Sequence, residues 1–157
     1  MWTPEEKRNK DSPMERIVYY FNHIAKWVVY TLLFSPKLKD RVRDMEKMLR
    51  VVIELRKLDN YDTCFAVISG LENQSVYRLI KTLEDVKKID LEVMDEGRKR
   101  SQGNLRVSAK GGSLWLKYQS CRALMARDRN FAPYRMAFKN SFGSRIPWLY
   151  ATVQFAF

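Results

Sequence analysis

The sequence predicts an all-α fold, in which several helices of unequal length pack irregularly in one domain. Its 157 residues suit a single domain, and 46% of them are hydrophobic, which is enough to form a core. Between residues 14 and 96 the apolar residues recur every three or four positions, which is the period of an amphipathic helix. We expect four or five packed helices and no sheet in this part of the chain.

The first helix is predicted to begin at Ser12 and to end at Ser35. Ser12 can cap it, Pro13 suits its first turn, and Glu15 lies where a carboxylate complements the helix dipole. Its buried stripe has residues spaced by three or four positions: Ile17, Phe21, Ile24, Val28 and Leu32. Pro36 disfavours helical geometry at Ser35, so the helix should end there.

Three more helices are predicted before residue 90. The second spans about 38–58, up to a turn at Asp59 and Asn60, and its apolar face consists of Leu38, Val42, Met45, Leu49, Val52 and Leu55. The third covers about 62–70 and ends near Gly70, where a left-handed residue is often needed. Ser75 is the predicted cap of the fourth, whose apolar face consists of Val76, Leu79, Ile80, Leu83 and Val86.

Residues 98–113 are predicted to be a poorly ordered loop, because they mix glycine, serine and basic residues and lack an apolar period. Helical spacing resumes at about 114–125 and again at about 133–139. The last stretch, 146–157, is apolar and uncharged, which suits a strand-like or extended segment.

The net charge of +11 belongs to one stretch of the chain. Residues 1–97 carry equal numbers of basic and acidic residues, whereas residues 98–145 hold 12 Lys and Arg against the single acid Asp128. The favoured interpretation of the basic stretch 98–113 is a solvated loop. One alternative is attraction to an anionic membrane surface. Nucleic-acid binding, with bases stacked on Trp115 and Tyr118, is less favoured because no known nucleic-acid motif supports it.

Neither a metal site nor a covalent catalytic site is predicted. Cys64 and Cys121 lie far apart without a Cys or His cluster, and His23 is the only histidine. The sequence has no nucleophile motif and no glycine-rich phosphate-binding loop, so we expect no cofactor and no enzyme activity. The longest apolar run, 27–34, is shorter than the roughly 20 residues that span a bilayer. The expected setting is cytoplasmic, with recruitment to a membrane left open.

Four sequence blocks resemble one known family. "FNHIAKWVVYTLL" carries Phe21, Asn22 and Trp27, and "KLKDRVRDMEKMLRVVIELRKLDNYD" carries Arg41 and Asn60. The most specific block is "FAVISGLENQSVYRLIKTLEDV", whose matching residues are Ser69, Gly70, Leu71, Val76, Arg78, Leu79 and Thr82. The last block is "RNFAPYR" followed by "IPWL", with Arg129, Asn130, Phe131, Tyr134 and Arg135. Together the blocks resemble the catalytic domain of Ras-family guanine-nucleotide exchange factors (RasGEF).

The resemblance implies a partner and a role. In that family the helices form a bowl that grips the switch II segment of a Ras-like small GTPase, while a helical hairpin displaces switch I. It implies that this chain binds such a GTPase and promotes GDP release without covalent chemistry. The implied GTPase-binding residues are Val18, Phe65, Glu72, Phe131 and Trp148. Core packing is an equal alternative for the apolar ones.

Three residues of the matching blocks are better interpreted as structural than as partner contacts. They are a cap, Asn60, and two partners for backbone or acidic groups, Arg41 and Arg78.

The sequence also departs from the family pattern. Leu83 stands where tryptophan is usual, Glu72 replaces a frequent asparagine, and 98–113 resemble an insertion. The family's helix before Met1 and its hairpin after Pro147 have no counterpart, so residues 1–157 are expected to form an incomplete domain with weak exchange activity. The alternatives are a degenerate binding module of the same fold and a basic helical protein that binds nucleic acid.

Overall fold

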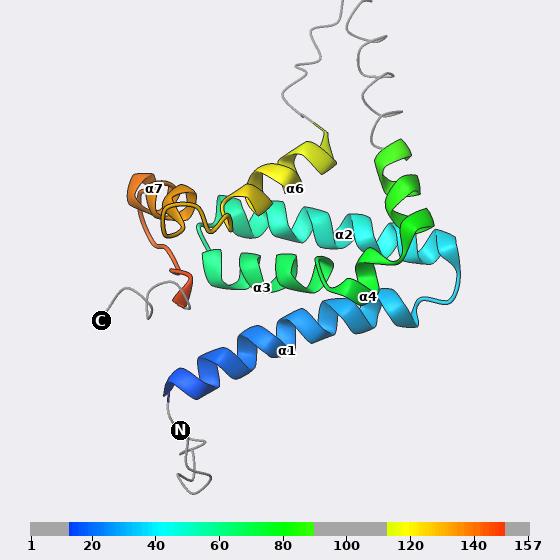
Figure 1. The fold of residues 1–157 in the computed structure, drawn as a ribbon, viewed down its shortest axis with the longest axis horizontal. Helices are drawn as coiled ribbons and strands as arrows, with labels where there is room; N and C mark the ends of the chain where they lie inside the picture. Colours follow the sequence, from blue (N-terminus) through cyan, green and yellow to red (C-terminus); the bar gives the residue numbers. More distant parts are fainter. Residues whose placement is uncertain (1–12, 90–112, 150–157) are drawn as a thin grey trace, which may run out of the picture.

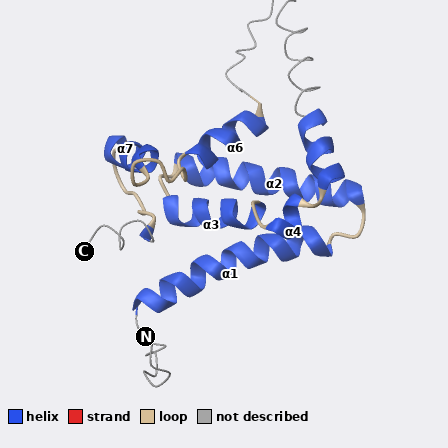
Figure 2. Ribbon diagram, viewed as in Figure 1, coloured by secondary structure: helices blue, strands red, loops and turns tan. Residues whose placement is uncertain are grey.

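The computed structural model describes residues 13–89 and 113–149, and these ranges consist of helices and connecting loops (Figures 1 and 2). The helices are α1 (Pro13–Phe34), α2 (Leu38–Lys57), α3 (Tyr61–Leu71), α4 (Gln74–Tyr77), α6 (Leu114–Ala123) and α7 (Ala132–Asn140), with a further helix whose described part covers 80–89. The described residues form no strand, only an isolated parallel bridge between Asn60 and Ile146. The all-α prediction is confirmed.

The helix α3 is the centre of the fold. It lies between α1 and α2, and α6 packs on α2 (Figure 1). Its buried residues point in nearly every direction around the axis: Tyr61, Cys64, Phe65, Ala66, Val67, Ile68, Gly70 and Leu71. A helix that is apolar all round is a buried helix, so α1 and α2 each need only one apolar face to cover it.

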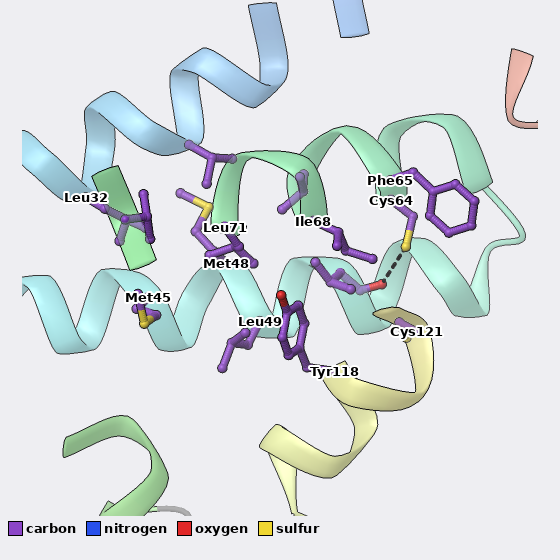
Figure 3. Packing of buried hydrophobic residues seen from close by; sticks show 14 of the residues in the cluster. Leu32, Met45, Met48, Leu49, Cys64, Phe65, Ile68, Leu71, Tyr118 and Cys121 are labelled. Atoms are coloured by element: carbon purple, nitrogen blue, oxygen red, sulfur yellow. Dashed lines mark hydrogen bonds between the residues drawn. The ribbon is translucent and has the colours of Figure 1, made fainter. Parts of the chain in front are cut away.

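Those two faces and α6 close the core. Leu32 comes from α1, Met45 and Leu49 come from α2, and Tyr118 and Cys121 come from α6 (Figure 3). The thiol of Cys64 lies 3.6 Å from the backbone oxygen of Val52, which gives this buried sulfur a weak polar contact across α2 and α3. The stripes read from the sequence therefore meet in one cluster.

The ends of α3 and α4 agree with the prediction at one cap and differ at the other. Asn60 caps α3 as predicted, because its side-chain Oδ1 accepts the backbone N–H of Thr63 over 3.1 Å. The cap of α4 is Asn73, not Ser75: Asn73 Oδ1 accepts the N–H of Ser75 over 3.0 Å. An asparagine side chain can bond the backbone two residues on, so the helix begins earlier than predicted, ends at Tyr77, and resumes at residue 80.

Gly70 does not end α3 in a left-handed conformation, as the sequence suggested. It lies inside the helix, which continues to Leu71 and is followed by Glu72 as C-cap. A Cβ atom at position 70 would lie 2.6 Å from the backbone oxygen of Ala25 and 2.7 Å from the Cβ of Val28. Glycine is therefore required because α1 approaches the backbone of α3 closely.

The second half of the chain has two helices near the expected positions. α6 is capped by Ser113, whose Oγ accepts the N–H of Leu116 over 3.2 Å, so the last residue of the predicted loop belongs to a helix end. The remainder of that loop, 98–112, lies outside the described residues, as do Ser12 and 150–157 of the predicted extended segment. None of the described helices is long and apolar enough to cross a membrane.

Candidate functional site

Five aromatic residues gather at the N-terminal end of α3. We call them the aromatic cluster: Tyr61, Phe65, Phe131, Tyr134 and Trp148. The ring of Trp148 lies 4.9 Å from that of Phe65 and 5.0 Å from that of Phe131, with both pairs edge to face. Edge-to-face pairs at this separation add to the free energy gained by burial alone. All five side chains are buried.

Backbone hydrogen bonds hold Trp148 in place. The N–H of Ile146 donates to the oxygen of Asp59, and the N–H of Tyr61 donates to the oxygen of Ile146, each over 3.0 Å. The N–H of Trp148 donates to the hydroxyl of Tyr134 over 2.8 Å. The segment after α7 is thus fixed against the start of α3, a contact between residues more than 80 positions apart in sequence.

A half-buried carboxyl completes this attachment. Asp62 Oδ1 accepts the N–H of Leu149 over 3.2 Å. Burial raises the pKa of the Asp62 carboxyl above its ordinary value, and the Leu149 N–H opposes that rise in part. The sequence showed Asp59 and Asn60 as a turn but gave no sign that this turn would receive a segment from the other end of the described chain.

A left-handed turn presents Phe131 to the aromatic cluster. Arg129, Asn130 and Phe131 have φ values of 48°, 57° and 55°, a region that non-glycine residues seldom adopt. The N–H of Ala132 closes the turn on the oxygen of Asp128 over 3.1 Å, and Arg135 donates from Nη2 to the oxygen of Arg129 over 2.9 Å. These bonds help to maintain a conformation that is costly in isolation.

The structure brings together three of the five predicted GTPase-binding residues. Phe65, Phe131 and Trp148 share the aromatic cluster, and all three are buried. Val18 stands apart on α1 and is 53% exposed. A direct contact between these residues and a partner stays a prediction.

Glu72, the fifth predicted residue, lies at the other end of α3 from the cluster. Its Oε1 forms an ion pair with Nε of Arg122 on α6, and both side chains are partly exposed. The sequence gave no indication of Arg122, because the two residues are 50 positions apart. This pair forms part of the wall of a groove of about 330 Å³. The groove is lined by Met45, Leu49, Leu71, Glu72, Tyr77, Leu83, Lys87, Trp115, Tyr118, Gln119 and Arg122.

The groove has an apolar floor and a charged rim. The Nζ atom of Lys87 lies 4.8 Å from the ring centroid of Trp115, within range of a cation–π contact. Tyr118 is buried, and burial raises the pKa of its hydroxyl, so the hydroxyl stays neutral. These side chains offer an apolar surface with charges beside it, and none is arranged as a nucleophile with a base.

Asn60, Arg41 and Arg78, which were predicted to have structural roles, make different kinds of hydrogen bond. Asn60 is the cap of α3, and Arg41 donates to Thr82 Oγ1 over 3.0 Å and to the backbone oxygen of Ser35 over 2.9 Å. Arg78 is exposed and is the C-cap residue of α4, with its backbone N–H bonded to the oxygen of Gln74. For Arg78 the structure assigns a role to the backbone position and not to the guanidinium.

The part of the chain that the structure describes contains no metal-binding group of side chains and no reactive thiol. Within it, no three His, Cys, Asp or Glu side chains are grouped so as to hold a metal ion. Cys64 and Cys121 are both buried and unpaired with each other as a disulfide. Burial raises the pKa of the Cys64 thiol to about 12, which keeps it in the unreactive protonated form.

Comparison with known proteins decides the family. The family model of the RasGEF domain matches residues 1–154. The chain belongs to the RasGEF domain family. The RasGEF match covers the aromatic cluster, the turn that presents Phe131, and the Glu72–Arg122 pair alike.

Curated relatives of this RasGEF chain include three exchange factors. Ras guanine nucleotide exchange factor P of Dictyostelium discoideum is 26% identical over 94% of this chain and 8% of its own length. Ras guanine nucleotide exchange factor K of the same organism is 35% identical over 60% of this chain and 6% of its own. Rap guanine nucleotide exchange factor 1 of Homo sapiens is 28% identical over 50% of this chain and 7% of its own. The chain thus spans less than a tenth of these relatives.

Proposed function

We propose that this RasGEF chain binds a Ras-like small GTPase and promotes the release of its GDP. The observation that carries the proposal is the aromatic cluster, in which Phe65, Phe131 and Trp148 converge from three separate segments of the chain. The RasGEF family and the exchange factors among its relatives give the type of partner.

The proposed contact divides the predicted residues into two groups. Because Phe65, Phe131 and Trp148 are buried, their role is to set the shape and rigidity of the surface above them. Val18, which is half exposed, offers apolar area to the partner directly. Glu72 contributes a carboxylate whose position is fixed by Arg122, and it suits a basic side chain of the GTPase.

The proposed mechanism requires no covalent step. A protein that binds the nucleotide-free GTPase more tightly than the loaded GTPase lowers the affinity for nucleotide by the same factor. The rate of release then rises because the partner's pocket is reshaped.

Two measurements on the same GTPases test the proposal. Ras, Rap and Ral types loaded with a fluorescent GDP analogue are mixed with the chain, and nucleotide release is followed beside a pull-down of the nucleotide-free forms. Binding together with faster release supports the proposal. Binding without faster release would favour the degenerate binding module, and lack of binding to every GTPase would exclude the proposed partner.

A pair of valine variants makes the test specific to the surface. Val18→Asp places a charge at the proposed contact and should weaken GTPase binding by about tenfold or more. Val51→Asp is the matched control, because Val51 is also an exposed valine on a helix, α2. Equal binding by the two variants would remove α1 from the proposed interface.

A further inference from the structure

The helix α1 carries an aromatic face on the side away from the core. α1 packs against α3 and α2 and forms one edge of the molecule (Figure 1). The aromatic face consists of residues that recur at helical spacing and are all exposed: Tyr19, Tyr20, His23, Trp27, Tyr30 and Phe34. The ring centroids of Tyr30 and Phe34 lie 6.0 Å apart, and those of Tyr19 and His23 lie 5.9 Å apart, with Trp27 between the two pairs along the helix.

This face lies at the upper end of the sizes of apolar patch that soluble monomers expose. Trp27 is 50% exposed and Phe34 is 79% exposed. Since a fully buried aromatic side chain covers roughly 150–250 Å², half-exposed rings along α1 present an area on the order of 600 Å². Contiguous patches of this size mark a site of interaction with a protein or a membrane.

Basic residues accompany the aromatic face along its whole length. The exposed Arg16 lies three residues before Tyr19, and the exposed Lys26 lies next to Trp27. Two more exposed lysines, Lys37 and Lys39, follow the end of α1. Two acidic residues lie nearby and are only partly exposed: Glu15, one helical turn before Tyr19, and Asp40, next to Lys39. The four basic residues outnumber them. The surface around the aromatic face is therefore positively charged.

We propose that the aromatic face of α1 and its flanking basic residues bind the surface of an anionic membrane. Tyr and Trp combine an apolar ring with a polar tip, and such side chains favour the membrane interface. An amphipathic helix that lies in this interface typically carries aromatic residues on one face and Lys or Arg beside them. The basic residues would contact lipid phosphates and carboxylates, whereas a second copy of this chain would bring like charges together.

The proposal is independent of GTPase binding and goes beyond it. It concerns where the chain docks, and it predicts that α1 lies parallel to the membrane surface. A GTPase partner is not needed for the contact, so the test uses the chain and lipid alone.

Vesicle flotation with designed variants tests the proposal. The whole chain is mixed with vesicles of phosphatidylcholine alone or of phosphatidylcholine with phosphatidylserine, and the bound fraction is measured. The aromatic variant is Trp27→Ser with Phe34→Ser, and the charge variant is Lys26→Glu with Lys37→Glu. The control variant is Tyr77→Ser with Phe142→Ser, since both residues are highly exposed aromatics outside α1. Circular dichroism and thermal unfolding check that each variant keeps the fold.

The expected result is binding that requires phosphatidylserine and falls with salt. The aromatic variant should lower the partition coefficient by about tenfold or more, and the charge variant by a similar factor, while the control variant leaves it unchanged. No binding of the native chain to phosphatidylserine vesicles would overturn the proposal. So would equal binding by all variants. Sedimentation equilibrium distinguishes the other occupant: a native dimer that the aromatic variant converts to a monomer would assign the face to a second copy.

Discussion

Arg41 of α2 donates a hydrogen bond from Nε to Thr82 Oγ1 over 3.0 Å, and from Nη1 to the backbone oxygen of Ser35 over 2.9 Å. One guanidinium therefore joins the loop after α1, the helix α2 and the 80–89 helix. Thr82 is buried, with 1% of its surface exposed, so its hydroxyl depends on partners within the protein.

Removal of this link should destabilise the fold. We expect Arg41→Ala to lower the free energy of unfolding by about 1–3 kcal/mol, because it leaves polar groups without a partner. Arg43→Ala is the control: Arg43 pairs with Asp40 on the surface of the same helix, with 64% of its side chain exposed, and should cost well under about 1 kcal/mol. Urea unfolding measures both, and equal costs would show that the Arg41 link contributes no more than a surface ion pair.

Gly70→Ala should push α1 away from α3. The added Cβ would lie 2.6 Å from the oxygen of Ala25, a backbone atom that cannot move without the helix. Overpacking of this kind costs about 1–3 kcal/mol or more, and it should increase hydrogen exchange in α1 and α3 together. Ser69→Ala, one residue earlier on the same helix, serves as the control and should change stability little. A Gly70→Ala chain as stable as the native chain would mean that the two helices can separate freely.

The sequence predicted the elements better than their contacts. The stripe that includes Val28 and Leu32 placed α1, and Pro36 set its end, because both signals act within one turn of helix. The cap at Asn60 is local in the same sense. For α4 two cap candidates lie two residues apart, and only the geometry of the Asn73 side chain decides between them.

Long-range contacts were beyond sequence reasoning for a physical reason. The requirement for Gly70 comes from Ala25, a residue of another helix, and the same glycine would equally suit a helix end. Likewise, an aromatic residue such as Phe65 suits both a core and a binding pocket, and its complete burial became evident only once Trp148 and Tyr134 were placed against it. The Glu72–Arg122 pair depends on how α3 and α6 are placed.

Two carboxyls should change stability with pH in opposite directions. Burial raises the pKa of Asp62, so the folded state favours the protonated carboxyl. As pH rises from 3.8, the ordinary pKa, through the higher pKa of the folded state, the carboxyl must ionise where it is partly buried, and the protein loses stability. Asp62→Asn keeps an oxygen that accepts the Leu149 N–H and removes the charge. We therefore expect this variant to be more stable than the native chain at pH 7, with the advantage lost below pH 3.8.

Asp44 provides the opposite case. The hydroxyl of Ser35, 2.8 Å from Asp44 Oδ2, and then the bond from Lys47 hold the pKa of this carboxyl below 3.8. Its stabilisation is therefore present above pH 3.8 and is lost as pH falls through the folded pKa. Asp44→Asn should be less stable than the native chain at pH 7 by less than about 1 kcal/mol, because the site lies at the surface and its partner Lys47 has 63% of its side chain exposed. Urea unfolding across pH would contradict both predictions if the two variants shifted in the same direction.

Substitutions at Phe65 and at Val18 should affect the free energy of unfolding and the proposed GTPase binding differently. Phe65 is completely buried, and its ring meets those of Tyr61, Tyr134 and Trp148. Phe65→Ala leaves a cavity there and should lower the free energy of unfolding by about 3–5 kcal/mol, whereas Phe65→Leu keeps most of the volume and should cost clearly less.

A comparison of Phe65→Leu with Val18→Asp then decides what the aromatic cluster contributes to the proposed GTPase interface. If the cluster sets the shape of the surface above it, Phe65→Leu should weaken GTPase binding even though the chain stays folded, because edge-to-face contact with Trp148 is lost and the support beneath the surface loosens. Val18→Asp should weaken binding with almost no loss of stability, since the site is half exposed. Thermal unfolding and a pull-down on each variant give the two quantities separately. Native-like binding by folded Phe65→Leu, together with a loss for Val18→Asp, would limit the interface to the surface of α1 and assign the cluster to the core alone.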